Sequence, residues 1–222
     1  MTGATNARPS SADLSTSMGW VRDQGPRDTC LACAATTVHV QNRQTRGRHD
    51  KGLSEEFLHW SSRPQPPRYG TGRSVRQVSR ALNQHGQPTY ASWPYDPLTD
   101  EGSPGYLPPD LTGHQFWTGE LQAISGDIAS VRDCLLDGDA AVLGIALWPQ
   151  FYVADRGILE VPTAGSLLPA NHAVVAAGFN DSTQTFLICN SWGAGWGDGG
   201  RATMPYAAWA LVARGVWRLT PH

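Results

Sequence analysis

Residues 185–197 read Thr-Phe-Leu-Ile-Cys-Asn-Ser-Trp-Gly-Ala-Gly-Trp-Gly, and they pass from an apolar run into a turn rich in glycine and tryptophan. The run is short and bounded by turn residues, which is typical of a buried β-strand. Asn190 therefore stands at the end of a strand, and Trp192 follows two residues later. An asparagine in this position can hold a neighbouring group through its side-chain oxygen.

Apolar runs on either side of this stretch predict further strands, over 140–147, 173–179, 200–204 and 215–219. Helical spacing and caps predict helices over 30–43, 54–58, 74–85 and 128–136. Thr29 or Asp28 is expected to cap the first helix and Ser54 the second. Most of the helices precede the strands, so the chain is expected to be α+β, with a helical lobe and a sheet lobe.

The expected boundaries follow from this change of pattern. Residues 1–17 are expected to be a flexible tail, because they are polar, small and without periodicity. The helical lobe is expected over about 18–115 and the β lobe over about 116–222. A cleft between two lobes is a common place for a functional site.

Composition excludes several classes of protein. Of 222 residues, 40% are hydrophobic and only 16% charged, which is too apolar for a disordered chain. Seventeen basic and nineteen acidic residues give a net charge of −2, so nucleic acid is not an expected partner. No apolar run approaches the length of a membrane span, so no membrane association is expected. Four cysteines are too few for a small disulfide-stapled fold.

Three segments place reactive groups in special settings. Cys30 follows a turn and opens a helix, where free N–H groups and the helix dipole favour the thiolate. His172 stands at the entry to an apolar strand, and Asn190 at the end of another. A nucleophilic cysteine needs a base, and the base needs an orienting group. Gln24, upstream of Cys30, could donate to an oxyanion.

Six short motifs in chain order resemble those of the papain-like cysteine peptidases. They are Gln24-Gly25 before Cys30, Leu53-Ser54-Glu55-Glu56, Ser92-Trp93-Pro94-Tyr95, Asn171-His172-Ala173-Val174, the run Asn190 to Gly197, and Met204-Pro205-Tyr206. The resemblance implies a papain-like two-lobe fold, a helical lobe plus an antiparallel β-sheet or barrel lobe, with the active-site cleft between them. It also implies a thiol-dependent peptidase acting on a peptide or protein substrate.

The resemblance further implies a role for each matching residue. Cys30 would be the nucleophile, His172 the base that later protonates the leaving amine, and Asn190 the group that orients His172. Gln24 and the backbone N–H of Cys30 would hold the oxyanion. The resting state would be a thiolate–imidazolium pair. No metal and no cofactor are expected.

Contacts to the substrate are expected from a second set of residues around this triad. Trp192 would cover the His–Asn hydrogen bond, and Trp196 would line the leaving-group side. The whole expected set is Asp28, Thr29, Gly70, Gly72, Val142, Asn171, Ala173, Trp192 and Trp196.

The chain departs from the family pattern close to Cys30. Arg27 replaces a cysteine that the family pairs in a disulfide, and the matching stretch 68–72 also lacks a cysteine. Loss of both ends together is what a reducing compartment allows. Asp28 stands where the family has glycine, and we hypothesise that it favours basic or small groups before the scissile bond.

Other functions remain open from the sequence. Cys30 and Cys33 fit C-x-x-C, but the strand context of a redox motif and the second ligand pair of a zinc site are missing. A papain-like fold could also carry an amide-forming or deamidating acyltransferase, a binding module with a decayed site, or an effector or toxin domain with a narrow protein substrate. A regulatory partner or inhibitor is possible, since no inhibitory pro-segment is expected within the residues that precede Gln24. A cytoplasmic location is expected, or secretion if the natural chain begins earlier.

Overall fold

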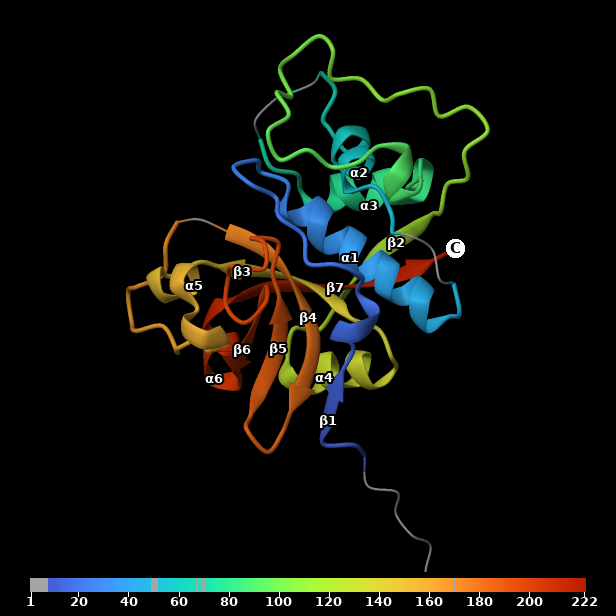
Figure 1. The fold of residues 1–222 in the computed structure, drawn as a ribbon. Helices are drawn as coiled ribbons and strands as arrows, with labels where there is room; N and C mark the ends of the chain where they lie inside the picture. The colour runs from blue at the N-terminus through green and yellow to red at the C-terminus, as the bar shows by residue number, and fades with distance from the viewer. Residues whose placement is uncertain (1–7, 49–51, 67, 69–70, 170) are drawn as a thin grey trace, which may run out of the picture.

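The computed structural model describes residues 8–48, 52–66, 68, 71–169 and 171–222 (Figure 1). Within them a seven-stranded antiparallel sheet has the order β2-β7-β3-β4-β5-β6, and β1 pairs with β4 beside this path. The strands are β1 Ser11–Asp13, β2 Gly119–Ile124, β3 Ala141–Ala146, β4 Asn171–Asn180, β5 Thr185–Cys189, β6 Arg201–Pro205 and β7 Ala213–Pro221.

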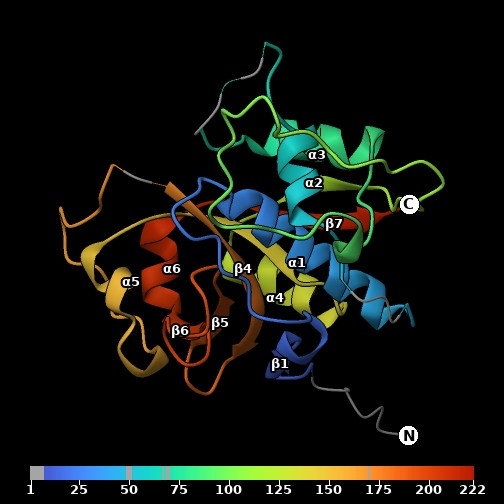
Figure 2. The same ribbon diagram turned by 45° about the horizontal axis from the view of Figure 1, so that its top comes forward.

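Helices cover both faces of the sheet. They are α1 Cys30–Thr45, α2 Glu55–Ser61, α3 Val75–Gln84, α4 Ile128–Leu136, α5 Pro149–Val153 and α6 Tyr206–Val212. Helix α1 packs on β4 and also contacts α2 and α3, and α3 itself packs on β2, whereas α5 and α6 lie at the other end of the molecule (Figures 1 and 2). Short 3₁₀ turns add Ser15–Ser17, Tyr90–Ser92 and Asp155–Gly157.

Alternating side chains of β3 enter two different cores. Leu143 and Ile145 pack with α4, α5 and α6, whereas Val142 packs with α1, α2 and α3 on the opposite face. A strand that is buried on both faces needs no polar positions, which explains why 140–147 is continuously apolar. Each large side chain fully removed from water contributes about 1.5–3 kcal/mol. The two cores thus fix α1 on one face of the sheet, and α5 and the turn that contains Trp192 and Trp196 on the other.

Side-chain caps set the starts of three helices. The Ser54 hydroxyl accepts from the Phe57 N–H at 3.0 Å, and Ser74 forms a capping box with Gln77. Asp127 caps α4 through the Ser130 N–H at 2.9 Å. Thr29 occupies the N-cap position of α1, but its side chain makes no capping bond. The predicted N-cap position at Thr29 is therefore confirmed, but the side-chain capping bond is absent.

The expected flexible tail is wrong for residues 11–17. Strand β1 pairs with β4, and Asp13 lies opposite Gly178. A Cβ at Gly178 would lie 2.3 Å from the Ala12 carbonyl oxygen, so only glycine lets β1 approach this closely. Residues 15–17 then form a 3₁₀ turn. Residues 1–7 of the expected tail lie outside the described part of the chain.

A buried histidine ties α1 to the long connection that follows α3. Nδ1 of His39 lies 2.9 Å from Oε1 of Gln87, and Nε2 of Gln87 donates to the Thr36 hydroxyl at 2.7 Å. The ring is fully buried, and its Nε2 has no hydrogen-bond partner among the described residues. Burial lowers the pKa of His39 to about 4 from its ordinary 6.5, although the Gln87 bond opposes the shift. Protonation of this ring would therefore destabilise the folded protein.

We predict that His39→Asn makes the protein less sensitive to acid. Between pH 6.5 and 4 the unfolded state binds a proton at His39 that the folded state does not, so the free energy of unfolding falls as the pH falls. This group should account for a loss on the order of 3 kcal/mol. Asparagine keeps an amide near Nδ1 without titrating, so urea unfolding should show a shallower pH dependence than wild type. The exposed His85→Asn is the control, and an equal slope for wild type and His39→Asn would contradict the prediction.

Candidate active site

Cys30 is the first residue of α1 and is partly exposed. Burial raises the pKa of its thiol, hydrogen bonds from the backbone of Ala173 and Leu31 lower it, and the Asp28 carboxylate raises it. The contact with Ala173 places the sulfur against the start of β4. Because His172 directly precedes Ala173, the backbone that contacts Cys30 is next in the chain to the predicted base, where α1 packs on β4.

His172 is held by the strand that follows it in the sheet. Its Nε2 lies 2.7 Å from Oδ1 of Asn190, which also accepts from the Ser191 N–H at 2.8 Å. This position follows from the pairing of β4 with β5, in which Val175 lies opposite Cys189. The Trp192 ring covers the imidazole, with 4.7 Å between ring centroids. His172 and Asn190 are thereby buried from solvent.

Burial acts against charge on both members of the predicted pair. It lowers the pKa of His172 to about 4, although the Asn190 hydrogen bond opposes the shift, and it raises that of Cys30. A thiolate–imidazolium pair here would depend on the mutual attraction of its two charges, because the surroundings of each group favour its neutral form. The ion pair stays a prediction.

Gln24 joins the segment before Cys30 to the segment after Asn190. Its Oε1 accepts from the Ser191 hydroxyl at 2.8 Å, and its backbone N–H donates to the Ser191 carbonyl at 2.8 Å. Its Nε2 donates to the Arg27 carbonyl at 2.8 Å. The neighbouring residues Asp23 and Trp192 form an isolated antiparallel β-bridge. The side chain of Gln24 is therefore oriented at both ends.

Two glycines allow close packing around Gln24, one of Gly193 against Asp23 and the other of Gly25 against Pro97. Gly193 has a φ of 73°, and a Cβ there would lie 2.9 Å from Oδ2 of Asp23. Gly25 has a φ of 56°, and a Cβ there would lie 2.7 Å from Cβ of Pro97. Both positions combine a left-handed backbone with no room for a side chain, which explains glycine in the two motifs.

Several residues predicted to contact substrate lie around Cys30 with exposed surface. Asp28 and Asn171 are exposed, and Trp192 is partly exposed. A Cβ on Gly72 would lie 3.9 Å from Cβ of Asp28, so these two positions are neighbours. Ala173 contacts Cys30 through its backbone. Gly70, also predicted to bind substrate, lies outside the described residues.

Three of the residues predicted to contact substrate have buried side chains, so their contacts with substrate stay predictions. The Thr29 hydroxyl bonds the Tyr95 hydroxyl at 2.7 Å, inside the helical part of the chain. Val142 is fully buried in the core under α1. Trp196 is 5% exposed, and its Nε1 donates to the Phe151 carbonyl at 2.8 Å, so it supports Trp192 from behind.

Sequence reasoning missed Ser191, which fixes Gln24, and the aromatic residues of α5. Tyr152 is 52% exposed and stacks on Trp192, with centroids 5.2 Å apart and planes at 21°. Phe151 meets the His172 ring edge-on at 5.9 Å. The only signal in the sequence was the adjacent aromatic pair after the apolar run, and α5 is too short for periodicity to reveal.

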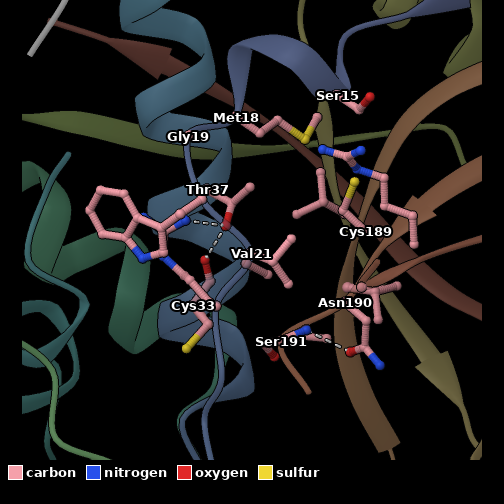
Figure 3. A pocket seen from close by; sticks show the side chains of 17 residues that line it. Ser15, Met18, Gly19, Val21, Cys33, Thr37, Cys189, Asn190 and Ser191 are labelled. Atoms are coloured by element: carbon pink, nitrogen blue, oxygen red, sulfur yellow. Dashed lines mark hydrogen bonds between the residues drawn. The ribbon is translucent and has the colours of Figure 1, made fainter. Parts of the chain in front are cut away.

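A small cavity lies behind Asn190, between α1 and the turn after β5. Figure 3 shows Cys33 and Thr37 on one side of it and Cys189, Asn190 and Ser191 on the other. Its volume is about 30 Å³, which is enough for a water molecule but not for a peptide. It therefore does not serve as the substrate site.

The described part of the chain contains neither a cluster of metal ligands nor a membrane-spanning helix. His, Cys, Asp and Glu side chains form no group of three that could hold a metal ion there. None of the helices in these same ranges is both long and apolar enough to cross a bilayer.

Known proteins with similar structures share this fold. Xylellain, a cysteine protease from Xylella fastidiosa, matches with a TM-score of 0.83 and 26% identity, covering 96% of this chain and 87% of its own. Procathepsin B from Trypanosoma congolense matches with a TM-score of 0.80 over 98% of this chain and 79% of its own, but at 16% identity that likeness concerns the fold alone. The papain-like α+β fold expected from the sequence is thus confirmed.

Two curated proteins are similar in sequence. An uncharacterized peptidase C1-like protein of Acanthamoeba polyphaga mimivirus is 26% identical over 197 residues, and a cathepsin L-like proteinase of Fasciola hepatica is 27% identical over 186. Each alignment covers 83% of this chain, but the chain spans only 63% and 56% of the length of these relatives.

The model of one protein family, described as papain family cysteine protease, matches residues 8–208. The match runs from β1 to the first turn of α6 and includes Cys30, His172 and Asn190. The chain therefore belongs to the papain family of cysteine proteases.

Proposed function

We propose that this chain hydrolyses peptide or amide bonds through an acyl-enzyme formed on Cys30. The observation that carries the proposal is the 2.7 Å contact between His172 and Asn190, made one residue before the Ala173 backbone that touches Cys30. Thiol-dependent acyl transfer requires a nucleophile, a base close to it, and a third group that orients the base.

The hydrogen bonds assign the proton to one nitrogen of His172. Oδ1 of Asn190 already accepts from the Ser191 N–H, and as a carbonyl oxygen it can only accept from Nε2 of His172. A neutral ring with hydrogen on Nε2 has its lone pair on Nδ1, which is then the atom that takes the thiol proton.

Acyl transfer then follows in two steps. The Cys30 sulfur attacks the substrate carbonyl, and His172 returns the thiol proton to the leaving amine. Water, deprotonated by His172, attacks the thioester and releases the acid and Cys30. Nε2 of Gln24 and the N–H of Cys30 at the start of α1 would donate to the oxyanion in both steps.

Replacing Cys30 by alanine should abolish peptide cleavage, because no other group in the site can form the acyl-enzyme. Asn190→Ala should fold and bind substrate but lower kcat on the order of 10- to 100-fold, since His172 loses its orienting partner. A peptide-library digest analysed by mass spectrometry measures both. The matched control Cys134→Ala removes a buried thiol far from the site and should leave cleavage unchanged. Cleavage by Cys30→Ala would refute the mechanism, and products joined to an added amine would show transfer in place of hydrolysis.

Asp28 supports a preference for basic residues immediately before the scissile bond. Its carboxylate is exposed, neighbours Gly72 and opposes a negative charge on Cys30. We expect peptides with Arg at this position to be cleaved faster than matched peptides with Glu. Asp28→Asn should reduce that ratio, and it should also move the midpoint of Cys30 alkylation by iodoacetamide to lower pH, because a charge that raises the pKa of the thiol is gone. Equal cleavage of both wild-type substrates would contradict the preference.

We also propose a reducing compartment for the protein, as expected from the sequence. All four cysteines are free. Arg27, which stands where the family has a disulfide-bonded cysteine, forms an ion pair with Glu56. A regulatory partner or inhibitor, and the natural protein substrate, stay predictions.

A further inference from the structure

The Arg27 side chain lies in a buried network of charged and polar groups. Its guanidinium forms a two-point pair with Glu56, with both nitrogen–oxygen distances at 2.7 Å. Its Nε donates to Glu101 at 3.1 Å, and the remaining N–H groups donate to the Asp96 carbonyl at 2.7 Å and the Tyr106 hydroxyl at 3.3 Å. All five N–H groups of the guanidinium are thus satisfied, although the side chain is only 6% exposed.

The network connects three separate segments of the chain. Glu56 lies on α2, while Asp96, Glu101 and Tyr106 belong to the long connection between α3 and β2. Glu101 also lies 3.1 Å from Nε2 of His59 and 3.7 Å from Arg73. Burial alone would raise the pKa of Glu101, but the contacts with His59 and Arg27 hold it at about 2. The carboxylate therefore stays charged at neutral pH.

The backbone of Arg27 holds the proposed catalytic segment. Its carbonyl accepts from Nε2 of Gln24 and from the Thr29 N–H, both at 2.8 Å. An amide nitrogen carries two hydrogens, so Gln24 can give its other hydrogen to an oxyanion. Thr29 is the residue before Cys30, whose own N–H is the second proposed donor. The Arg27 carbonyl group therefore helps to position both proposed oxyanion donors, Gln24 directly and Cys30 through Thr29.

We propose that Arg27 is a positioning residue, whose pairing with Glu56 and Glu101 sets the placement of the oxyanion donors Gln24 and Cys30. The inference rests on the proposed peptidase function. A guanidinium with five directed bonds fixes the backbone that carries it more tightly than a point charge would. Since an oxyanion exists only after attack on the carbonyl, a misplaced donor affects the chemical step and not substrate binding.

The test is a double-mutant cycle of Arg27→Lys with Gln24→Ala. Lysine keeps the charge but cannot form the two-point pair, so kcat per folded molecule should fall about 10- to 100-fold with KM changed less than about threefold. In the Gln24→Ala background the same substitution should lower kcat clearly less than in the wild-type background, because one of the two donors that Arg27 positions is already gone. Circular dichroism gives the folded fraction. If Arg27→Lys does not fold, Glu56→Gln, which removes one charge but keeps the shape, takes its place in the cycle.

Asp139→Asn is the matched control for general destabilisation. Asp139 is a buried carboxylate paired with Arg46 and Arg218, remote from Cys30, and its replacement should leave kcat within about twofold of wild type. An unchanged kcat in Arg27→Lys, or an equal fall in both Gln24 backgrounds, would overturn the inference. If the wild-type protein is active, either of these two results overturns the role of Arg27 but not the proposed peptidase function. An inactive wild type, or an active Cys30→Ala variant, would overturn both the role of Arg27 and the proposed function.

Discussion

The site depends on the hydrogen bonds between Gln24 and Ser191. Gln24 precedes α1 and Ser191 follows β5, so these bonds join the helical part of the chain to the sheet beside Cys30 and His172. Ser191 also donates its backbone N–H to Asn190, the residue that holds His172. One dipeptide after a strand therefore orients both the proposed oxyanion donor and the proposed base. Displacement of this turn would disturb the two functions together.

Burial on both faces of the sheet makes that geometry rigid, but it also penalises charge. His172, His39 and His59 all have lowered pKa values because burial disfavours their protonated forms. Arg27 and Glu56 are also buried, and there the charges compensate each other through a two-point pair. The predicted Cys30–His172 ion pair would lie between these cases, because burial disfavours either charge without the other.

The sequence predicted the parts of the fold whose pattern is local. Apolar runs located β3 to β7, and the Ser54 and Ser74 caps located α2 and α3 within a residue or two. Strand β1 was missed because three residues of edge pairing leave no periodic signal, and α5 and α6 because they are short. Among the predicted site residues, the motifs identified His172 and Asn190, which the structure places in contact. The burial of Thr29 and Val142 could not be predicted, because it depends on which distant segment packs over them. The Arg27 network joins residues far apart in the chain, and no spacing rule could reveal it.

The proposed mechanism requires that Cys30 carries the acyl group during turnover. Rapid quenching of the wild-type protein with an activated peptide ester, followed by mass spectrometry of its proteolytic fragments, measures this directly. The account predicts an increase equal to the acyl group on the fragment that contains Cys30, which disappears as hydrolysis proceeds. An acyl group found only on fragments with Cys134 or Cys189, or steady hydrolysis without any acylated fragment, would contradict it.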